Sequence, residues 1–271
     1  MTGKFTLKEN FDLAREAVLK AGEIALEGLQ TKDFKTWLKG GYEPVTEIDL
    51  KVNEYLKQVL TKARPGYGWL SEESVDDRER LNLKYVWVVD PIDGTRALIK
   101  GKDDFTICAA LVEDGKPVVG AIFSPARKEL YLALEGAGAT LNGKPIQVGG
   151  AKVVEGMKLQ GDEDYFDRPK RWQSPWRNVT YSKYQSFALR VVSVAAGEFD
   201  AAISARPKSE WDLAAADLIV TEAGGICCGS DGRPFTYNNE NTRIARIVAA
   251  NPALKDQILE KLKGRIPKNT S

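Results

Sequence analysis

The sequence predicts a layered α+β protein. Two helical patterns open the chain, a run of apolar strands joined by tight turns follows, and helices and strands then alternate to the C-terminus. Strands joined by tight turns are antiparallel, so this order favours stacked layers over a doubly wound parallel sheet.

The first half contains two helices and a meander of strands. Apolar residues recur at helical spacing over residues 10–30, and again from Ile48 to just before Arg64-Pro65-Gly66. Both helices have polar outer faces and should cover a sheet. Asp114-Gly115 is typical of a tight hairpin turn. The predicted strands are Tyr85–Asp90, Phe105–Glu113, Pro117–Ser124 and Glu129–Leu134.

The second half opens with an irregular, charged stretch, Asp162–Arg177. Beyond it the sequence predicts helices at 185–197, 211–222 and 252–263, and short strands at 199–203 and 247–250. A weak boundary lies near residues 145–155. We therefore expect two halves, residues 1–150 and 151–271, that form one compact unit.

Composition limits the possible functions. Lys plus Arg number 39 and Asp plus Glu 38 in 271 residues, so the net charge of +1 does not favour nucleic acid or an anionic membrane as partner. No stretch approaches the length of a membrane span, and the N-terminus does not resemble a signal peptide. Three cysteines indicate reduced thiols in a cytoplasmic protein.

Histidine is absent from the sequence. This absence excludes a Ser-His-Asp triad, a zinc site built on histidine, and a histidine general base. Any catalysis must therefore use carboxylates, hydroxyls, lysines, thiols or hard metal ions.

The most informative motif follows the apolar strand at residues 85–89. Asp90 and Asp93 end this strand with Pro91 between them, and two carboxylates on a stiff turn suit Mg²⁺. Gly94 permits close approach of a ligand, and Thr95 offers a hydroxyl and an N–H group at a helix start, which suits phosphate. The alternative is an ordinary proline turn that uses Asp for local hydrogen bonds.

Acidic residues also stand at the ends of three other predicted elements. Each has a purely structural explanation: Glu72-Glu73 as part of a solvated acidic loop, Asp49 as a helix cap after Thr46, and Asp212 as a first-turn helix acid. The functional hypothesis is that they meet the aspartates of the central motif around metal.

Four segments together resemble the inositol monophosphatase superfamily of metal-dependent phosphatases. They occur in the same order as in that superfamily and span nearly the whole chain. The segments are VTEID at 45–49, SEES at 71–74, WVVDPIDGT at 87–95 and WDLAAADLIVTEAGG at 211–225. The resemblance implies an αβαβα layered sandwich and commonly a homodimer.

The resemblance also implies a metal site, most of it in the first half. Glu72, Asp90 and the Ile92 carbonyl would hold one Mg²⁺, and Asp90 would bridge to a second held by Asp93 and Asp212. A third, weaker ion would lie near Glu72. Chelators, lithium and excess Ca²⁺ would inhibit such an enzyme.

Catalytic roles follow from the same resemblance. Asp49 and Thr95 would position and deprotonate the attacking water, with Glu72 also counted among the catalytic residues. The ester phosphate would rest on the metal ions and on the N–H groups of Gly94 and Thr95.

The substrate is less defined than the reaction. The segments at 232–238 and 105–117 look most like the 3'(2'),5'-bisphosphate nucleotidase branch, which converts 3'-phosphoadenosine 5'-phosphate to AMP and phosphate. A second phosphate would need basic groups, for which Arg190, Lys208 and Lys183 are candidates; a solvated surface charge is the alternative for each.

Two other phosphate esters remain open. The Ile in DPIDGT is frequent in inositol-1-monophosphatases, and the segment at 96–101 resembles histidinol-phosphate phosphatases. We place the nucleotide first. A regulatory binding protein with the same fold ranks last, because it would not need the full set of acids.

One further stretch mixes basic and aromatic residues, at 168–177. It could form a platform for a nucleobase or RNA. With a near-neutral net charge, a surface loop or dimer contact is the favoured interpretation.

Overall fold

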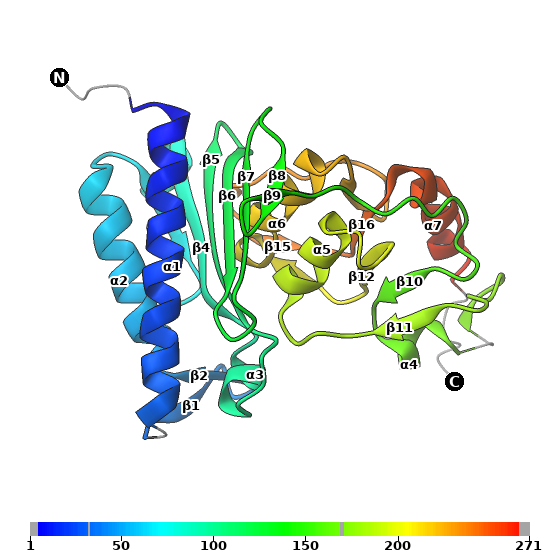
Figure 1. Ribbon diagram of the computed structural model, residues 1–271, viewed down its shortest axis with the longest axis horizontal. Helices are drawn as coiled ribbons and strands as arrows, with labels where there is room; N and C mark the ends of the chain where they lie inside the picture. Colours follow the sequence, from blue (N-terminus) through cyan, green and yellow to red (C-terminus); the bar gives the residue numbers. More distant parts are fainter. Residues whose placement is uncertain (1–4, 32, 169–170, 266–271) are drawn as a thin grey trace.

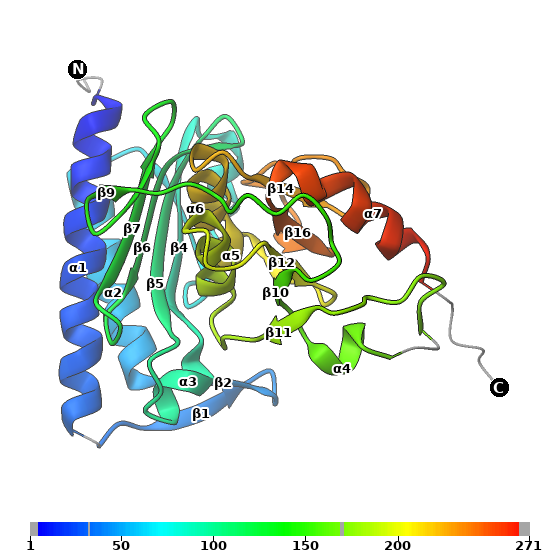
Figure 2. The same ribbon diagram turned by 45° about the vertical axis from the view of Figure 1, so that its right-hand side comes forward.

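The computed structural model describes residues 5–31, 33–168 and 171–265, which form five stacked layers (Figures 1 and 2). A helix pair covers one face of a large sheet, a second helix pair lies between this sheet and a smaller one, and a last helix covers the outer face of the smaller sheet. This arrangement confirms the expected αβαβα sandwich.

The outer helix pair consists of α1 (Leu7–Thr31) and α2 (Glu47–Ala63). Small residues on α1, including Ala14, Ala21 and Ala25, are fully buried. They let the helix lie close to the sheet, where Trp87 and Phe105 fill the space between layers.

The large sheet has the order β3-β4-β5-β6-β7-β8-β9. β3 pairs parallel with β4, and the other neighbours pair antiparallel, so the predicted meander is confirmed. The strands are β3 (Gly68–Ser71), β4 (Tyr85–Asp93), β5 (Thr106–Glu113), β6 (Lys116–Ser124), β7 (Glu129–Leu134), β8 (Ala139–Leu141) and β9 (Lys144–Pro145).

The inner helices, α5 (Phe187–Ala195) and α6 (Glu210–Glu222), bury most of their residues because protein surrounds them. The backbone of α6 approaches β6 very closely. A Cβ atom placed on Gly120 would lie 2.7 Å from the Ala215 carbonyl oxygen, so only glycine fits at this crossing.

The smaller sheet has the order β11-β10-β12-β16-β14 and is mixed. β10 pairs parallel with β11 and β12, whereas β16 pairs antiparallel with β12 and β14. The strands are β10 (Lys158–Gln160), β11 (Thr180–Ser182), β12 (Ala201–Ser204), β14 (Ile226–Gly229) and β16 (Ile247–Ala250).

The outer face of the smaller sheet is covered by α7 (Lys255–Lys263), which follows the 3₁₀ turn η3 (Pro252–Leu254). The short helix α4 (Glu163–Phe166) lies within the stretch expected to be irregular. Among the described residues of the basic and aromatic stretch, Trp172 and Trp176 are each only 3% exposed. They pack on Phe166, so the tryptophans belong to a core and do not present a platform to a base. Residues 169 and 170 of that stretch lie outside the described residues.

Several short elements were not expected from the sequence. A hairpin of β1 (Thr36–Lys39) and β2 (Glu43–Thr46) precedes α2, and β13 (Lys208–Ser209) pairs with β15 (Arg243–Ile244) just before α6. Another is the 3₁₀ helix η1 (Arg78–Asn82), whereas the one-turn helix α3 (Thr95–Ile99) begins at Thr95, where the sequence indicated a helix start. Within the described ranges, no helix has both the length and the apolar character needed to cross a membrane.

Candidate metal centre and active site

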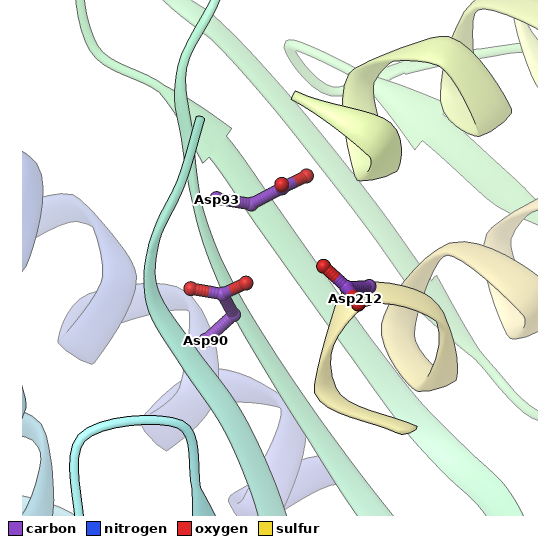
Figure 3. A group of neighbouring side chains, drawn as sticks. All are labelled: Asp90, Asp93 and Asp212. Carbon is purple, nitrogen blue, oxygen red and sulfur yellow. The ribbon is translucent and has the colours of Figure 1, made fainter. Parts of the chain in front are cut away.

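Three aspartates from distant parts of the chain meet between β4 and α6. One carboxylate oxygen of each of Asp90, Asp93 and Asp212 lies within 4.8 Å of the others (Figure 3). Asp90 and Asp93 come from β4 and Asp212 from the first turn of α6. The structure therefore brings these three acids together, as the metal hypothesis requires.

A bulge in β4 brings its two aspartates together. Asp90 pairs with Cys108 and Asp93 with Thr106, so three steps along β4 oppose two steps along β5. Side chains three residues apart in a regular strand point to opposite faces, and the extra residue restores a common face. The bulge at Pro91-Ile92 is thus the reason that both carboxylates lie on the same side of β4.

Asp90 is the most isolated of the three acids. It is 1% exposed, and neither carboxylate oxygen has a hydrogen-bond partner within the described residues. Burial, and then the carboxylates of Glu72, Asp93 and Asp212, raise the pKa of Asp90 well above its ordinary value. A buried, unpaired carboxylate among other acids is costly unless a cation accompanies it.

Asp93 is held in one orientation. Its Oδ2 accepts hydrogen bonds from the Ser186 hydroxyl (2.7 Å) and the Ala188 N–H (2.6 Å), which leaves Oδ1 able to face the other acids. The Thr106 hydroxyl lies 2.9 Å from that of Ser186 and extends this support. Burial raises the pKa of Asp93 to about 6, opposed by Lys208.

Asp212 is held by a capping box at the start of α6. Its Oδ2 accepts the Ser209 N–H at 2.6 Å, which fixes the carboxylate beside the β4 acids. The structural explanation of Asp212 as a helix acid is therefore confirmed, and a capping role leaves its other oxygen available to a metal ion.

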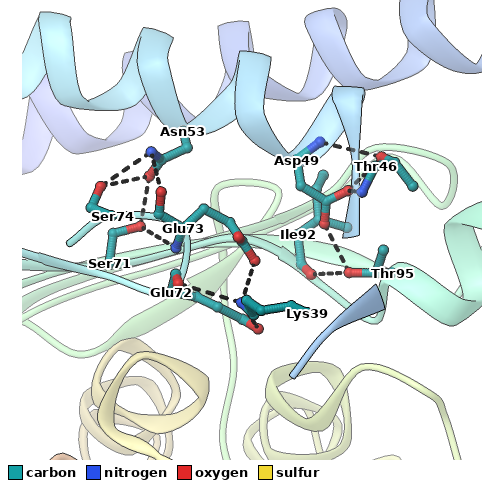
Figure 4. A network of polar contacts seen from close by, with 10 residues as sticks. All are labelled: Lys39, Thr46, Asp49, Asn53, Ser71, Glu72, Glu73, Ser74, Ile92 and Thr95. Atoms are coloured by element: carbon teal, nitrogen blue, oxygen red, sulfur yellow. Dashed lines mark hydrogen bonds and ion pairs between the residues drawn. The ribbon is translucent and has the colours of Figure 1, made fainter. Parts of the chain in front are cut away.

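Glu72 directly follows β3 and is not one of the three acids that lie within 4.8 Å of one another, although its charge acts on Asp90 and that of Asp212 acts on it. Burial raises its pKa to about 7, with Asp212 and Glu73 adding to the rise and Lys39 opposing it. The Lys39 Nζ lies 3.1 Å from Glu72 and 2.7 Å from Glu73 (Figure 4). No sequence pattern pointed to Lys39, because its hairpin lacks a clear strand pattern.

The turn that carries Glu72 is fixed by Asn53 on α2. Its Nδ2 donates to the Glu73 carbonyl at 3.2 Å, and its Oδ1 accepts the Ser71 hydroxyl at 2.7 Å (Figure 4). The Ser71 hydroxyl therefore helps to fix the conformation of this turn.

Asp49 both caps α2 and contacts Thr95. Its Oδ2 accepts the N–H (2.9 Å) and the hydroxyl of Thr46, while Oδ1 accepts the Thr95 hydroxyl at 2.8 Å (Figure 4). The same hydroxyl lies 3.2 Å from the Ile92 carbonyl oxygen. Burial raises the pKa of Asp49, opposed by these hydrogen bonds.

Gly94 makes the turn between β4 and α3 possible. Its φ of +97° is left-handed, and a Cβ there would lie 3.1 Å from both the Asp104 carbonyl oxygen and the Ser186 nitrogen. The structure thus gives Gly94 a conformational role, and the expected close approach of a ligand stays a prediction.

Of the three basic candidates, only Lys208 forms an ion pair with one of these acids within the described residues. The Lys208 Nζ is 3.7 Å from Asp212 Oδ1. Arg190 donates from Nε to the Tyr184 carbonyl, and burial lowers its pKa, opposed first by Asp93. Lys183 instead pairs with Asp162 at 2.7 Å on a more exposed surface.

The donor set fits a hard divalent cation. All of its candidate ligands are oxygens, from Glu72, Asp90, Asp93, Asp212 and the Ile92 carbonyl, and one of the carboxylates is unpaired and buried. Oxygen ligands suit Mg²⁺, Mn²⁺ or Ca²⁺.

An αβαβα sandwich with this acidic pocket between its layers defines a metal-dependent phosphatase. A family model described as the inositol monophosphatase family matches residues 7–266. The chain belongs to that family, and the predicted resemblance is confirmed.

Curated relatives cover nearly the whole chain. It is 31% identical over 259 residues to the Nus factor SuhB of Pasteurella multocida, covering 93% of this chain and 94% of that protein. It is 30% identical over 260 residues to an inositol-1-monophosphatase of Rhizobium meliloti, covering 93% and 95%.

Solved structures share the fold. The SuhB protein of Bartonella henselae aligns with a TM-score of 0.80 at 28% identity, covering 94% of this chain and 98% of that one. The inositol monophosphatase of Thermotoga maritima aligns with a TM-score of 0.80 at 26% identity, covering 94% and 97%.

Proposed function

We propose that the protein hydrolyses the phosphate monoester of a small metabolite with Mg²⁺ held by Glu72, Asp90, Asp93, Asp212 and the Ile92 carbonyl. The observation that carries this proposal is the convergence of three carboxylates within 4.8 Å, with both oxygens of Asp90 unpaired in the described structure. The proposed site binds two Mg²⁺ ions, and a third, weaker ion near Glu72.

Bound Mg²⁺ would offset the charge of the ester phosphate and favour deprotonation of a water molecule. Thr95 and Asp49 would take up the proton that this water loses. The Thr95 hydroxyl already donates to Asp49, so it can accept a proton from water while passing its own to the carboxylate. Gly94 and Thr95 would offer their N–H groups to the phosphate.

Inositol 1-phosphate is one candidate substrate. Its support is the printed activity of the Rhizobium meliloti relative, an inositol-1-monophosphatase at 30% identity. A single phosphate on a neutral ring could be bound by the metal ions alone, without a basic side chain.

A 3'(2'),5'-bisphosphate nucleotide is the other candidate. Its support is the ion pair of Lys208 with Asp212 and the effect of the Asp93 charge on Arg190, since both cations could bind a second phosphate. Neither of the two curated relatives carries the name of a nucleotidase. Histidinol phosphate rests on the segment at 96–101 alone.

One experiment separates these candidates. Phosphate release would be measured with Mg²⁺ from 3'-phosphoadenosine 5'-phosphate, inositol 1-phosphate and histidinol phosphate, and kcat/KM compared. Replacing Arg190 and Lys208 by Met should reduce kcat/KM for the bisphosphate far more than for inositol 1-phosphate. Equal losses on both would contradict a second phosphate site, and no release from any ester would contradict phosphatase activity.

Inhibition and assembly complete the proposal. Chelators, lithium and excess Ca²⁺ should inhibit, since Ca²⁺ accepts longer and less regular coordination than Mg²⁺. A homodimer and a cytoplasmic location stay predictions, to be tested by sedimentation and by cell fractionation. A monomer at micromolar concentration, or recovery outside the cytoplasmic fraction, would contradict them.

A further inference from the structure

Two charged side chains without a role in the proposed chemistry are completely buried. Arg80 on η1 is 1% exposed, and Glu210, the first residue of α6, is 0% exposed. Burying a charge costs free energy unless partners surround it, so the partners of these two residues indicate what they hold together.

The partners of Glu210 lie in residues 236–244, here called the clamp segment. The Glu210 carboxylate accepts the N–H groups of Asn238 (2.7 Å) and Asn239 (3.0 Å) and the side-chain amide of Asn239 (2.7 Å). Its own N–H donates to the Thr242 carbonyl at 2.9 Å.

The partners of Arg80 lie in the same clamp segment and in the loop after Glu72. Arg80 donates to both carboxylate oxygens of Asp76, at 2.6 and 2.9 Å. It also donates to the Asn238 side chain (2.7 Å) and the Asn239 carbonyl (3.1 Å), and its own carbonyl accepts the Asn238 amide (3.0 Å).

Two further contacts fasten the clamp segment to α6. At its end, β15 pairs with β13, and the Arg243 guanidinium donates to the Ser209 hydroxyl at 3.2 Å. Near its start, the Tyr237 hydroxyl donates to Asp217 at 2.6 Å.

These contacts connect the loop that follows Glu72 with the start of α6, which carries Asp212. Asp76 lies four residues after Glu72, and Glu210 lies two residues before Asp212. The connection runs from the loop after Glu72 through Asp76, Arg80, Asn238 and Asn239 to Glu210, and from there along the first turn of α6 to Asp212. The two acids come from distant parts of the chain, and no hydrogen bond within the described residues joins them directly.

We propose that the clamp segment, with Arg80 and Glu210 as positioning residues, sets the position of Asp212 relative to Glu72 and so determines the affinity for divalent cations. The inference rests on the proposed function, because it assigns both acids to the metal site. Residues that support metal ligands typically change metal affinity by about 10- to 100-fold when they are replaced.

The test is Mg²⁺ binding measured calorimetrically without substrate. Glu210→Gln keeps the shape of the side chain but turns one acceptor into an NH₂ group facing the Asn238 N–H. Asn239→Ala is milder, since it removes the side-chain bonds to Glu210 and to the Thr236 carbonyl and keeps the backbone N–H bond to Glu210. We expect Mg²⁺ affinity to fall about tenfold or more in Glu210→Gln, with the KM for substrate at saturating Mg²⁺ nearly unchanged.

A matched control is Asn251→Ala. Asn251 is also buried, and its amide donates to the Gly149 and Ala151 carbonyls rather than to any residue of the clamp. This variant should lose thermal stability and keep its Mg²⁺ affinity.

The outcomes are distinct. Wild-type Mg²⁺ affinity in a folded Glu210→Gln protein, or an equal loss in Asn251→Ala, would overturn the proposed role of the clamp segment. Either result would leave the proposed function intact. If Glu210→Gln does not fold, Asn239→Ala decides by the same measurement. A wild-type protein that binds no Mg²⁺ would overturn both proposals.

Discussion

At the scale of single residues, Asp90 combines a structural cost with a proposed functional benefit. Its carboxylate is buried without a hydrogen bond within the described structure, and its neighbours are Asp93, Glu72 and Asp212. In the absence of cations, the ionised form is therefore unfavourable.

Asp90→Asn should separate these two effects. Turnover should fall by about three orders of magnitude, because the proposed bridging ligand is lost. In the presence of a chelator, however, the variant should unfold at a higher temperature than the wild type, since the amide carries no charge. Asp256→Asn on α7 is the control, because that carboxylate is exposed. Near-normal turnover in Asp90→Asn would contradict its proposed role.

Asp217 allows a prediction about pH outside the metal ligands. Burial raises its pKa from 3.8 to about 6, opposed by hydrogen bonds from Tyr237 and Thr221. When the folded-state pKa of an acid is raised, the native state binds more protons than the unfolded state. Stability therefore falls as pH rises from about 4 to about 6 and is constant above that range.

Asp217→Asn should remove this contribution. Relative to the wild type, the variant should gain about 2 kcal/mol of unfolding free energy between pH 4 and pH 7, measured with urea at saturating Mg²⁺. A difference between the two proteins that does not change with pH would contradict this account of Asp217.

At the scale of elements, the crossing of α6 over β6 depends on a glycine. Gly120→Ala would place a methyl group against the Ala215 backbone, which cannot move like a flexible side chain. We expect a loss of about 1–3 kcal/mol of unfolding free energy in urea. Gly150→Ala is the matched control, because a Cβ atom at that position would have no neighbour within 4 Å and its φ is not left-handed. Equal stability of the two variants would show that the layers can shift.

Elements with a long, regular pattern were predictable from sequence. The spacing of Ala14, Val18, Ala21 and Ala25 defined α1, and the turn at Asp114-Gly115 defined the β5–β6 hairpin. Most strands of two to four residues were missed, as in β1, β2 and β10, because so few positions cannot show a period. The exceptions include β12 and β16, whose residues are all buried and apolar or small.

The acids of the candidate site could be predicted from the sequence, whereas the residues that hold them in place could not. Asp90, Asp93 and Asp212 stand in motifs, whereas Lys39, Asn53 and Ser186 reach the site only through tertiary packing. The sequence also could not show that an extra residue in β4 turns Asp93 to the same face as Asp90. Register is a property of two strands, and one strand's sequence does not contain it.

At the scale of the whole molecule, the two halves at 1–150 and 151–271 share one core. Strands β4 to β7 of the first half pack against α5 and α6 of the second, and the group of three aspartates comes from both halves. We therefore propose that the chain unfolds as a single unit.

Differential scanning calorimetry tests this proposal. The calorimetric and van 't Hoff enthalpies should agree, as they do for a two-state transition. Two resolved transitions, or a calorimetric enthalpy well above the van 't Hoff value, would instead indicate that the halves unfold separately.

The proposed function depends on acids from across the chain forming one site for divalent cations. The anomalous scattering of Mn²⁺ soaked into crystals of the protein would locate such ions without reference to activity. We expect strong anomalous peaks bounded by the carboxylates of Asp90, Asp93 and Asp212, with further density beside Glu72. Peaks confined to other parts of the surface, or none at millimolar Mn²⁺, would contradict the proposed site.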